Sequence, residues 1–246
     1  MRVAYSAVPR PLPANALRFK RRLLKWFRAA GRDLPWRRTR DPYHVLVSEF
    51  MLQQTQVARV TEYYPRFLDR FPTIESLAGA SPRRVREAWE GLGYYRRAAN
   101  LHQLARTVVR DHDGALPDDP AVLATMPGVG AYTAGAVASF AFEKRAAAVD
   151  TNAARVLGRV FAANGKRKTG RRTGAPTPAS DRSTWDLARR LLPKRSRAAW
   201  EFNQALMDLG ARYCTARRPN CPACPVRPAC RTGADGLRGT ASRATR

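Results

Sequence analysis

Acidic residues are scarce in this chain of 246 residues. It has 19 aspartates and glutamates against 45 lysines and arginines, which gives a formal net charge of +26 and an isoelectric point near 11.4. Such an excess of positive charge is typical of proteins that bind a polyanion, with DNA or RNA as the first candidate and a membrane surface as the second. Hydrophobic residues make up 44% of the chain, which is enough for a buried core in one large domain or two smaller ones.

Long apolar segments are also absent. No run approaches the roughly 20 apolar residues that a membrane-spanning helix needs. The N-terminal stretch MRVAYSAVPRPLPANALRFKRR has no apolar core of the kind found in signal peptides. We therefore expect a cytoplasmic protein that does not bind membranes.

The alternating pattern of β-strands is missing, and no hairpin signal occurs. Segments with helical periodicity occur instead, and three of them start with a capping residue followed by proline, at residues 41–42, 81–82 and 119–120. The sequence therefore predicts an all-α fold. Asn15 is the expected N-cap of the first helix, and the expected helices cover residues 16–30, 43–60, 64–71, 81–89, 96–112, 119–125, 131–142, 152–163, 183–192 and 197–213.

Cysteine is confined to four residues near the C-terminal end: Cys214, Cys221, Cys224 and Cys230. Four thiols within seventeen residues of a cytosolic chain indicate a metal centre rather than a disulfide framework. Zinc is the alternative, but structural zinc usually takes two short chelating pairs, and only Cys221 and Cys224 form one. The spacing C-x6-C-x2-C-x5-C suits a [4Fe–4S] cluster better.

The stretch MPGVGAYTAGAV contains two glycines that flank one apolar residue, at Gly128, Val129 and Gly130. Glycine permits tight turns and close backbone approach. The turn leads into the small-residue helix expected from Ala131, and free N–H groups at a helix N-terminus bind anions. The alternative is a plain connection between two helices, followed by Asp150 as an N-cap.

Glu49 lies within an apolar helical run, so it is either an exposed residue of that helix or a carboxyl group held in a pocket of low dielectric. The loop GLGYYRR at 91–97 combines glycine, paired tyrosines and arginines. It is either an exposed loop that touches nucleic acid or a turn with tyrosines in the core. Three further segments carry no chemistry: an irregular arm at 1–14, a mobile basic insertion at 165–182 and a disordered basic tail at 233–246.

Taken together, these motifs resemble the helix-hairpin-helix DNA glycosylases, and closely the MutY-type adenine DNA glycosylases. The matching segments occur in order over residues 15–232: LPW at 34–36, SEFMLQQTQV at 48–57, WEGLGYYRRAANL at 89–101, MPGVGAYTAGAV at 126–137, VDTN at 149–152, FNQALMDLG at 202–210 and the four cysteines. The resemblance implies a six-helix barrel domain with the hairpin at 43–147. It also implies a [4Fe–4S] cluster domain built from both chain ends, at 15–42 and 148–232.

The resemblance further implies the reaction: hydrolysis of the N-glycosidic bond of an adenine mispaired with 8-oxoguanine or guanine in double-stranded DNA, without strong strand cleavage. Glu49 would protonate the adenine ring and Asp150 would stabilise the sugar cation, as in two-carboxylate glycoside hydrolysis. Tyr132 and Asn152 correspond to residues that support this pair. We expect a monomer associated with the nucleoid of a bacterial-type cell through its DNA.

The family's DNA contacts map onto further residues of this chain. Trp36 and Gln204 match positions that line the adenine pocket, and Gln53 and Tyr94 match residues that enter the base stack around the extruded nucleotide. The hairpin Gly128-Val129-Gly130 would bind a backbone phosphate through main-chain N–H groups.

Two departures from the family pattern leave the substrate open. Thr151 follows Asp150 where many adenine glycosylases have glycine, and the chain ends soon after the cysteines, so we expect it to lack the C-terminal domain that reads 8-oxoguanine. A T/G-mismatch thymine glycosylase of the same fold is one alternative. A non-catalytic, cluster-containing DNA-binding module is another, although such a module has no need of both Glu49 and Asp150.

Overall fold

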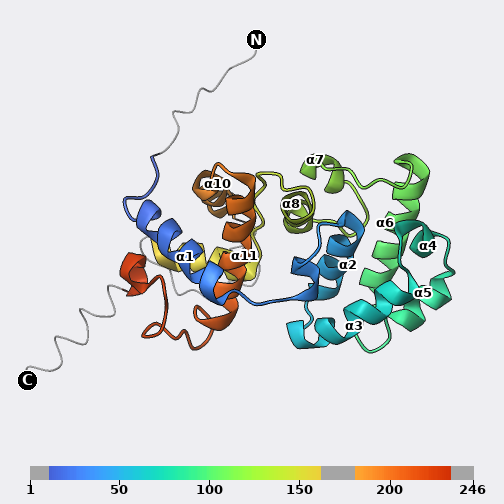
Figure 1. The fold of residues 1–246 in the computed structure, drawn as a ribbon, viewed down its shortest axis with the longest axis horizontal. Helices are drawn as coiled ribbons and strands as arrows, with labels where there is room; N and C mark the ends of the chain where they lie inside the picture. The colour runs from blue at the N-terminus through green and yellow to red at the C-terminus, as the bar shows by residue number, and fades with distance from the viewer. Residues whose placement is uncertain (1–10, 162–180, 234–246) are drawn as a thin grey trace, which may run out of the picture.

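The computed structural model describes residues 11–161 and 181–233, and all regular secondary structure in this part of the chain is helical, without a β-strand (Figure 1). The prediction of an all-α fold is therefore confirmed. Most of the insertion at 165–182, most of the N-terminal arm and nearly all of the tail lie outside the described residues, and the last two residues of the insertion, Asp181 and Arg182, are the N-cap and the first residue of helix α10 (Arg182–Leu191). The elements are α1 (Ala16–Ala30), η1 (Pro35–Arg37), α2 (Pro42–Leu52), α3 (Val57–Arg70), α4 (Ile74–Ala78), α5 (Pro82–Ala88), α6 (Arg96–Asp111), α7 (Pro120–Leu123), α8 (Ala131–Phe140), α9 (Thr151–Phe161), α10 (Arg182–Leu191), α11 (Ser196–Arg212) and η2 (Arg227–Ala229).

Three helices start as their capping residues predict. The side chain of Asp41 accepts a hydrogen bond from the main-chain N–H of His44 at the start of α2 (2.9 Å), Ser81 caps α5 and Asp119 caps α7, each followed by proline. These side chains satisfy N–H groups that have no partner within the helix. Asn15 behaves differently: its side chain makes no cap and instead donates to the carbonyl of Ala229 (2.8 Å), which ties the start of α1 to the C-terminal segment.

The helix predicted over residues 43–60 is wrong, because the chain breaks there into α2 and α3. Helix α2 ends at Leu52, and Gln54 takes a positive φ of 57° that a right-handed helix cannot include. The apolar run that forms α2 is buried, whereas the following Gln53-Gln54-Thr55-Gln56 is polar and forms the turn. The predicted helix at 64–71 is the second half of α3.

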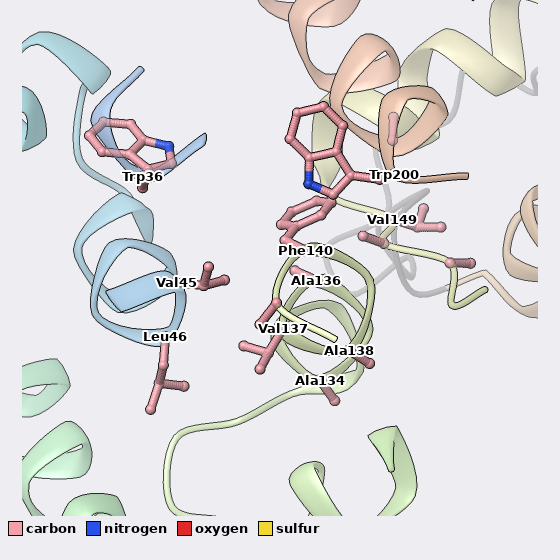
Figure 2. Packing of buried hydrophobic residues seen from close by; sticks show 14 of the residues in the cluster. Trp36, Val45, Leu46, Ala134, Ala136, Val137, Ala138, Phe140, Val149 and Trp200 are labelled. Carbon is pink, nitrogen blue, oxygen red and sulfur yellow. The ribbon is translucent and has the colours of Figure 1, made fainter. Parts of the chain in front are cut away.

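Helix α8 owes its central position to its small side chains. It packs against α2 on one side, and Figure 2 shows Val45 of α2 facing Val137 of α8. On another side, a Cβ atom on Gly135 would lie 2.0 Å from the carbonyl oxygen of Ala147, so only glycine lets the returning chain 146–149 lie this close. This buried segment ends at Asp150, and the packing of α8 therefore fixes where that carboxylate lies.

The two ends of the chain meet at one end of the molecule. Helix α1 packs on α11, and α11 packs on α9, whereas α4, α5 and α6 lie at the other end, with α2 and α8 between (Figure 1). The ring of Phe19 in α1 packs edge to face against the rings of Phe161 and Phe202, with centroid separations of 5.2 Å and 6.4 Å. Such aromatic pairs add about 0.5–1.5 kcal/mol each beyond their buried area. A division into a barrel domain and a cluster domain is compatible with this arrangement and stays a prediction.

None of the helices in the described segments combines the length and apolar character that crossing a membrane requires.

Candidate active site

Glu49 is buried in the centre of the molecule, on the last turns of α2. Only 3% of the residue is exposed, and its Oε2 atom has no hydrogen-bond partner. Burial raises the pKa of Glu49 to about 7, with a further rise from the charge of Asp150, while the Tyr132 hydroxyl and the charge of Arg37 act in the opposite direction. Of the two sequence-based readings, the carboxyl group in a low-dielectric pocket is the one that the structure shows.

Asp150 lies at the N-terminus of α9 and is held by two donors. Its Oδ2 accepts from the side-chain amide of Asn152 (2.9 Å), and its Oδ1 accepts from the main-chain N–H of Ala153 (2.6 Å). Burial raises the pKa of Asp150 above its ordinary value, and these hydrogen bonds offset only part of that rise. Two donors stabilise the ionised form of Asp150, whereas none reaches Oε2 of Glu49, so the surroundings favour the proton on Glu49 and the negative charge on Asp150.

Tyr132, on the first turn of α8, hydrogen-bonds to Glu49 and lies close enough to Asp150 to feel its charge. Burial raises its pKa well above that of a free tyrosine, and the nearby Glu49 and Asp150 raise it further, so the phenol stays neutral. Its hydroxyl also lies 3.4 Å from the sulfur of Met207. The structure thus brings together Glu49, Asp150, Tyr132 and Asn152, as the sequence predicts, while their catalytic roles stay predictions.

The two residues predicted to line a base pocket are both buried. Trp36, on η1, is 6% exposed and packs edge to face against Tyr64 at 5.6 Å, and Gln204, on α11, is 5% exposed. Within the described residues neither side chain hydrogen-bonds to Glu49 or Asp150. Their role in a pocket for adenine stays a prediction.

A buried ion cluster, which the sequence did not reveal, holds the segment that carries Trp36. Asp208 of α11 is fully buried and pairs with Arg32 (2.7 Å) and Arg37 (2.8 Å). Burial raises the pKa of Asp208, but the two arginines lower it by more. The ion pairs of Asp208 hold the segment that contains Trp36 against helix α11. The charge of Arg37 also lowers the pKa of Glu49, so this cluster acts on the buried carboxyl group as well. Two arginines among 45 basic residues gave no sequence signal.

Arg97, which the sequence places in a candidate exposed loop, is a second buried cation. Its guanidinium lies between the rings of Trp89 and Tyr94, at 5.4 and 5.6 Å from their centroids. It donates to five main-chain carbonyl groups, those of Phe50, Met51, Gln53, Leu92 and Gly93. Arg97 therefore fastens the end of α2, where Gln53 lies, to the loop that presents Tyr94.

The loop 91–95 exposes its first tyrosine. Tyr94 is 61% exposed and takes a positive φ of 48°, with glycines of positive φ on both sides of Leu92. Gln53 is half-buried beside this loop. The alternative reading of 91–97 as a turn with core tyrosines is therefore wrong for Tyr94, and an exposed aromatic side chain is available to contact a ligand.

The glycine turn has the geometry of an anion-binding site. Gly128 has a φ of +76°, and a Cβ atom there would lie 2.8 Å from Cβ of Asn100 and 2.9 Å from the ring of Phe50. Val129 is buried and pins the turn, while Gly128 and Gly130 are exposed and lead directly into α8. Main-chain N–H groups at the exposed start of α8 are available to an anion, and the binding of a DNA phosphate there stays a prediction.

The four cysteines surround one small cavity of about 110 Å³, and none of them forms a disulfide. Arg159 approaches the sulfur of Cys214 at 3.4 Å, and the main-chain N–H of Gly233 approaches the sulfur of Cys230 at 3.4 Å. In the described ranges, no group of three or more histidine, cysteine, aspartate or glutamate side chains has the arrangement needed to bind one metal ion. Arg155 connects this region to Asp150, since it donates to the carbonyl of Cys214 (2.7 Å) and to Asn152 (2.6 Å).

Comparison with known proteins points to one family. Residues 47–196 match the HhH-GPD superfamily of base excision DNA repair proteins. The chain is 48% identical over 205 residues to the adenine DNA glycosylase of Mycobacterium tuberculosis, covering 83% of this chain and 64% of that protein. It is 44% identical over 230 residues to the human adenine DNA glycosylase, covering 89% and 40%. The chain therefore spans less than two thirds of the length of these two relatives.

A thymine-DNA glycosylase from Aeropyrum pernix is 37% identical over 213 residues, covering 86% of this chain and 92% of that protein. Among solved structures, that of a thermostable thymine-DNA glycosylase superposes with a TM-score of 0.79 at 31% identity, covering 90% of this chain and 97% of the other. A non-covalent endonuclease III–DNA complex gives a TM-score of 0.73 at 24% identity, covering 93% and 100%. These similarities confirm the predicted fold class.

Proposed function

Since this chain belongs to the HhH-GPD superfamily of base excision DNA repair proteins, we propose that it is a DNA glycosylase that removes adenine mispaired with 8-oxoguanine or guanine. The observation that carries the proposal is the pair of unlike carboxyl groups: Glu49 buried without donors at Oε2, and Asp150 held by two. A hydrolase that cleaves a glycosidic bond needs one acid and one anion, and the different surroundings of these two groups supply both.

The reaction divides between the two carboxyl groups. Glu49 donates its proton to a ring nitrogen of the extruded adenine, and the bond between the base and C1′ breaks with its electron pair going to adenine. Asp150 stabilises the positive charge that develops on the sugar. A water molecule then adds to C1′ and gives its proton back to Glu49, which leaves a free base, an abasic site and the enzyme in its starting state.

Strand cleavage is not part of the proposed activity. Bifunctional relatives use a lysine in the turn after the hairpin to form a Schiff base with the sugar. This chain has Tyr132 at that position, and its neutral phenol cannot form such an adduct. We therefore propose a monofunctional glycosylase. We further propose that it acts as a monomer on double-stranded DNA, in the cytoplasm, where a bacterial-type nucleoid lies.

The four cysteines fit a [4Fe–4S] cluster. All four line the same cavity and remain free of disulfides, and thiolates are the ligands that such clusters take. Cys214, Cys221, Cys224 and Cys230 would hold the cluster, which would fix the surrounding loop. Within the protein, Arg155 and Arg159 bind main-chain carbonyls of this loop and so position it against α9.

Removal of thymine from T·G pairs is the competing function. The archaeal thymine-DNA glycosylase matches this chain over 92% of its own length, and Thr151 departs from the glycine of many adenine glycosylases. The higher identity to adenine DNA glycosylases, 48% against 37%, favours adenine, as do the LQQT run and Gln204.

A single-turnover glycosylase assay on duplexes with A·8-oxoG, A·G, T·G and undamaged pairs distinguishes the candidates. Release of adenine from the first two supports the proposal, and preferential release of thymine supports the alternative. Binding without release of any base would leave only a non-catalytic DNA-binding module. Glu49→Gln serves as the control for contaminating activity.

A further inference from the structure

A basic groove runs between α5 and α6, on a part of the molecule that the catalytic residues do not use. The two helices pack side by side at the end of the molecule opposite the cysteines (Figure 1), and the cavity between them has a volume of about 490 Å³. The polar side chains that line it are Arg86, Tyr95, Arg96, His102, Gln103 and Arg106. Among the described residues, no carboxylate lines it.

The three arginines of this groove have no acidic partner among the described residues, and all three are exposed. Arg86 lies over the ring of Tyr95 at 5.0 Å, which orients its guanidinium along the groove wall. The acidic residue of α5 faces elsewhere: Glu87 pairs with Arg83 (2.9 Å) and with Arg70 (3.1 Å). The charge of Glu87 therefore offsets Arg70 and Arg83 on one side of α5, whereas Arg86, on the side of the groove, has no acidic partner among the described residues.

A buried histidine lies in the wall of the same groove. His102 is 6% exposed, and its Nε2 atom has no hydrogen-bond partner. An enclosed polar nitrogen without a partner is costly, and that cost is relieved when a hydrogen-bonding ligand or a water molecule arrives. The groove thus combines three uncompensated cations with an unsatisfied polar group, which is the environment of an anionic ligand.

We propose that this groove binds the sugar–phosphate backbone of DNA that flanks the mismatch, an inference that rests on the proposed function. From Arg96 to Arg106 helix α6 covers ten residues, or about 15 Å at 1.5 Å per residue. Phosphates follow one another at about 3.4 Å of rise along one strand, so the groove spans roughly four of them. The groove begins at Tyr95, directly after the exposed Tyr94, so it takes up the backbone on the side where the loop 91–95 meets the duplex.

Phosphate contacts determine affinity and its salt dependence but not the choice of base. The double substitution Arg86→Gln and Arg106→Gln tests the groove. Its matched control is Arg83→Gln and Arg110→Gln, which removes the same charge from α5 and α6 at arginines paired with Glu87 and Asp111. Binding to an undamaged duplex would be measured by fluorescence anisotropy from about 50 to about 200 mM salt.

We expect the groove variant to lower the slope of log K against log salt by about 1.8, which is 0.9 for each lost phosphate contact, and the control to lower it by less than half of that. Ethylation interference should show weakened signals at phosphates of one strand beside the mismatch, which identifies the strand. The single-turnover rate on saturating A·8-oxoG duplex should stay within about twofold of the wild type, since neither residue belongs to the catalytic machinery.

Equal slopes in the groove variant and the control would overturn the proposal, as would unchanged interference at every phosphate. The outcomes for the two proposals are separate. A wild-type protein that binds DNA through the groove but releases no base contradicts only the proposed function, whereas an active glycosylase with an unchanged slope in the groove variant contradicts only the groove.

Discussion

Replacing Glu49 with glutamine tests the proton distribution on which the proposed mechanism depends. Burial raises the pKa of Glu49 from 4.5 to about 7. Because the folded-state pKa lies above that of the unfolded chain, the stabilisation from this group is complete below pH 4.5 and is lost as the pH rises through 7. At 1.36 kcal/mol per pKa unit, the loss amounts to about 3 kcal/mol.

Glutamine has a similar shape and no proton to lose, so the variant should escape this loss. Relative to the wild type, the free energy of unfolding of Glu49→Gln should rise by about 3 kcal/mol between about pH 4 and about pH 8.5. For a protein of this size that gain corresponds to a Tm difference that grows by about 6–12 °C between the two pH values. Thermal unfolding followed by circular dichroism measures it. Glu62→Gln, at a carboxylate that is 57% exposed on α3, is the control and should show no such growth.

The activity of the wild type should follow the same titration. Only protonated Glu49 can act as the acid, so the single-turnover rate should fall about tenfold per pH unit above pH 7, and Glu49→Gln should be inactive throughout. The reasoning is refuted if the Tm difference between Glu49→Gln and the wild type is the same at both pH values. A wild-type rate that stays constant up to about pH 9 would equally contradict an acid with a pKa of about 7.

Further predictions concern the anion, the cluster, the chemistry at the sugar and Arg97. Asp150→Asn should bind duplex DNA normally and lose at least about 100-fold in excision rate, because it removes the charge that offsets the sugar cation; near-normal turnover would exclude that role. Borohydride should trap no covalent protein–DNA adduct, since Tyr132 replaces the lysine of bifunctional relatives, and efficient trapping would contradict this. Arg97→Met should lower the free energy of unfolding by about 3 kcal/mol or more, because five carbonyl groups lose their donor. A decrease below about 1 kcal/mol in urea unfolding would contradict a stabilising role of Arg97 between α2 and the loop 91–95. Purified protein should be brown and contain about four iron atoms per chain, and stoichiometric zinc without iron after anaerobic purification would overturn a cluster ligated by Cys214, Cys221, Cys224 and Cys230.

Local chemistry made much of the fold readable from the sequence. The caps at Asp41, Ser81 and Asp119 depend on hydrogen bonds between neighbours in the chain, so the sequence alone identifies where these helices start. The expected bounds of the first helix, 16–30, also match α1, which ends before Gly31 although the side chain of Asn15 makes no cap. The break between α2 and α3 was missed, because a positive φ at Gln54 is stabilised by distant groups, above all by Arg97 through the carbonyl of Gln53.

The candidate site divides in the same way. The sequence by itself determined which residues are present: two carboxyl groups in recognisable motifs, a glycine turn and four clustered cysteines. Only the tertiary structure decided which carboxyl group keeps the proton, because that depends on the donors at Asp150 and their absence at Oε2 of Glu49. It alone paired Asp208 with Arg32 and Arg37 and left the arginines of the α5–α6 groove uncompensated. The physical reason is that burial and long-range electrostatics are properties of the folded chain, which brings together charges that the sequence keeps far apart.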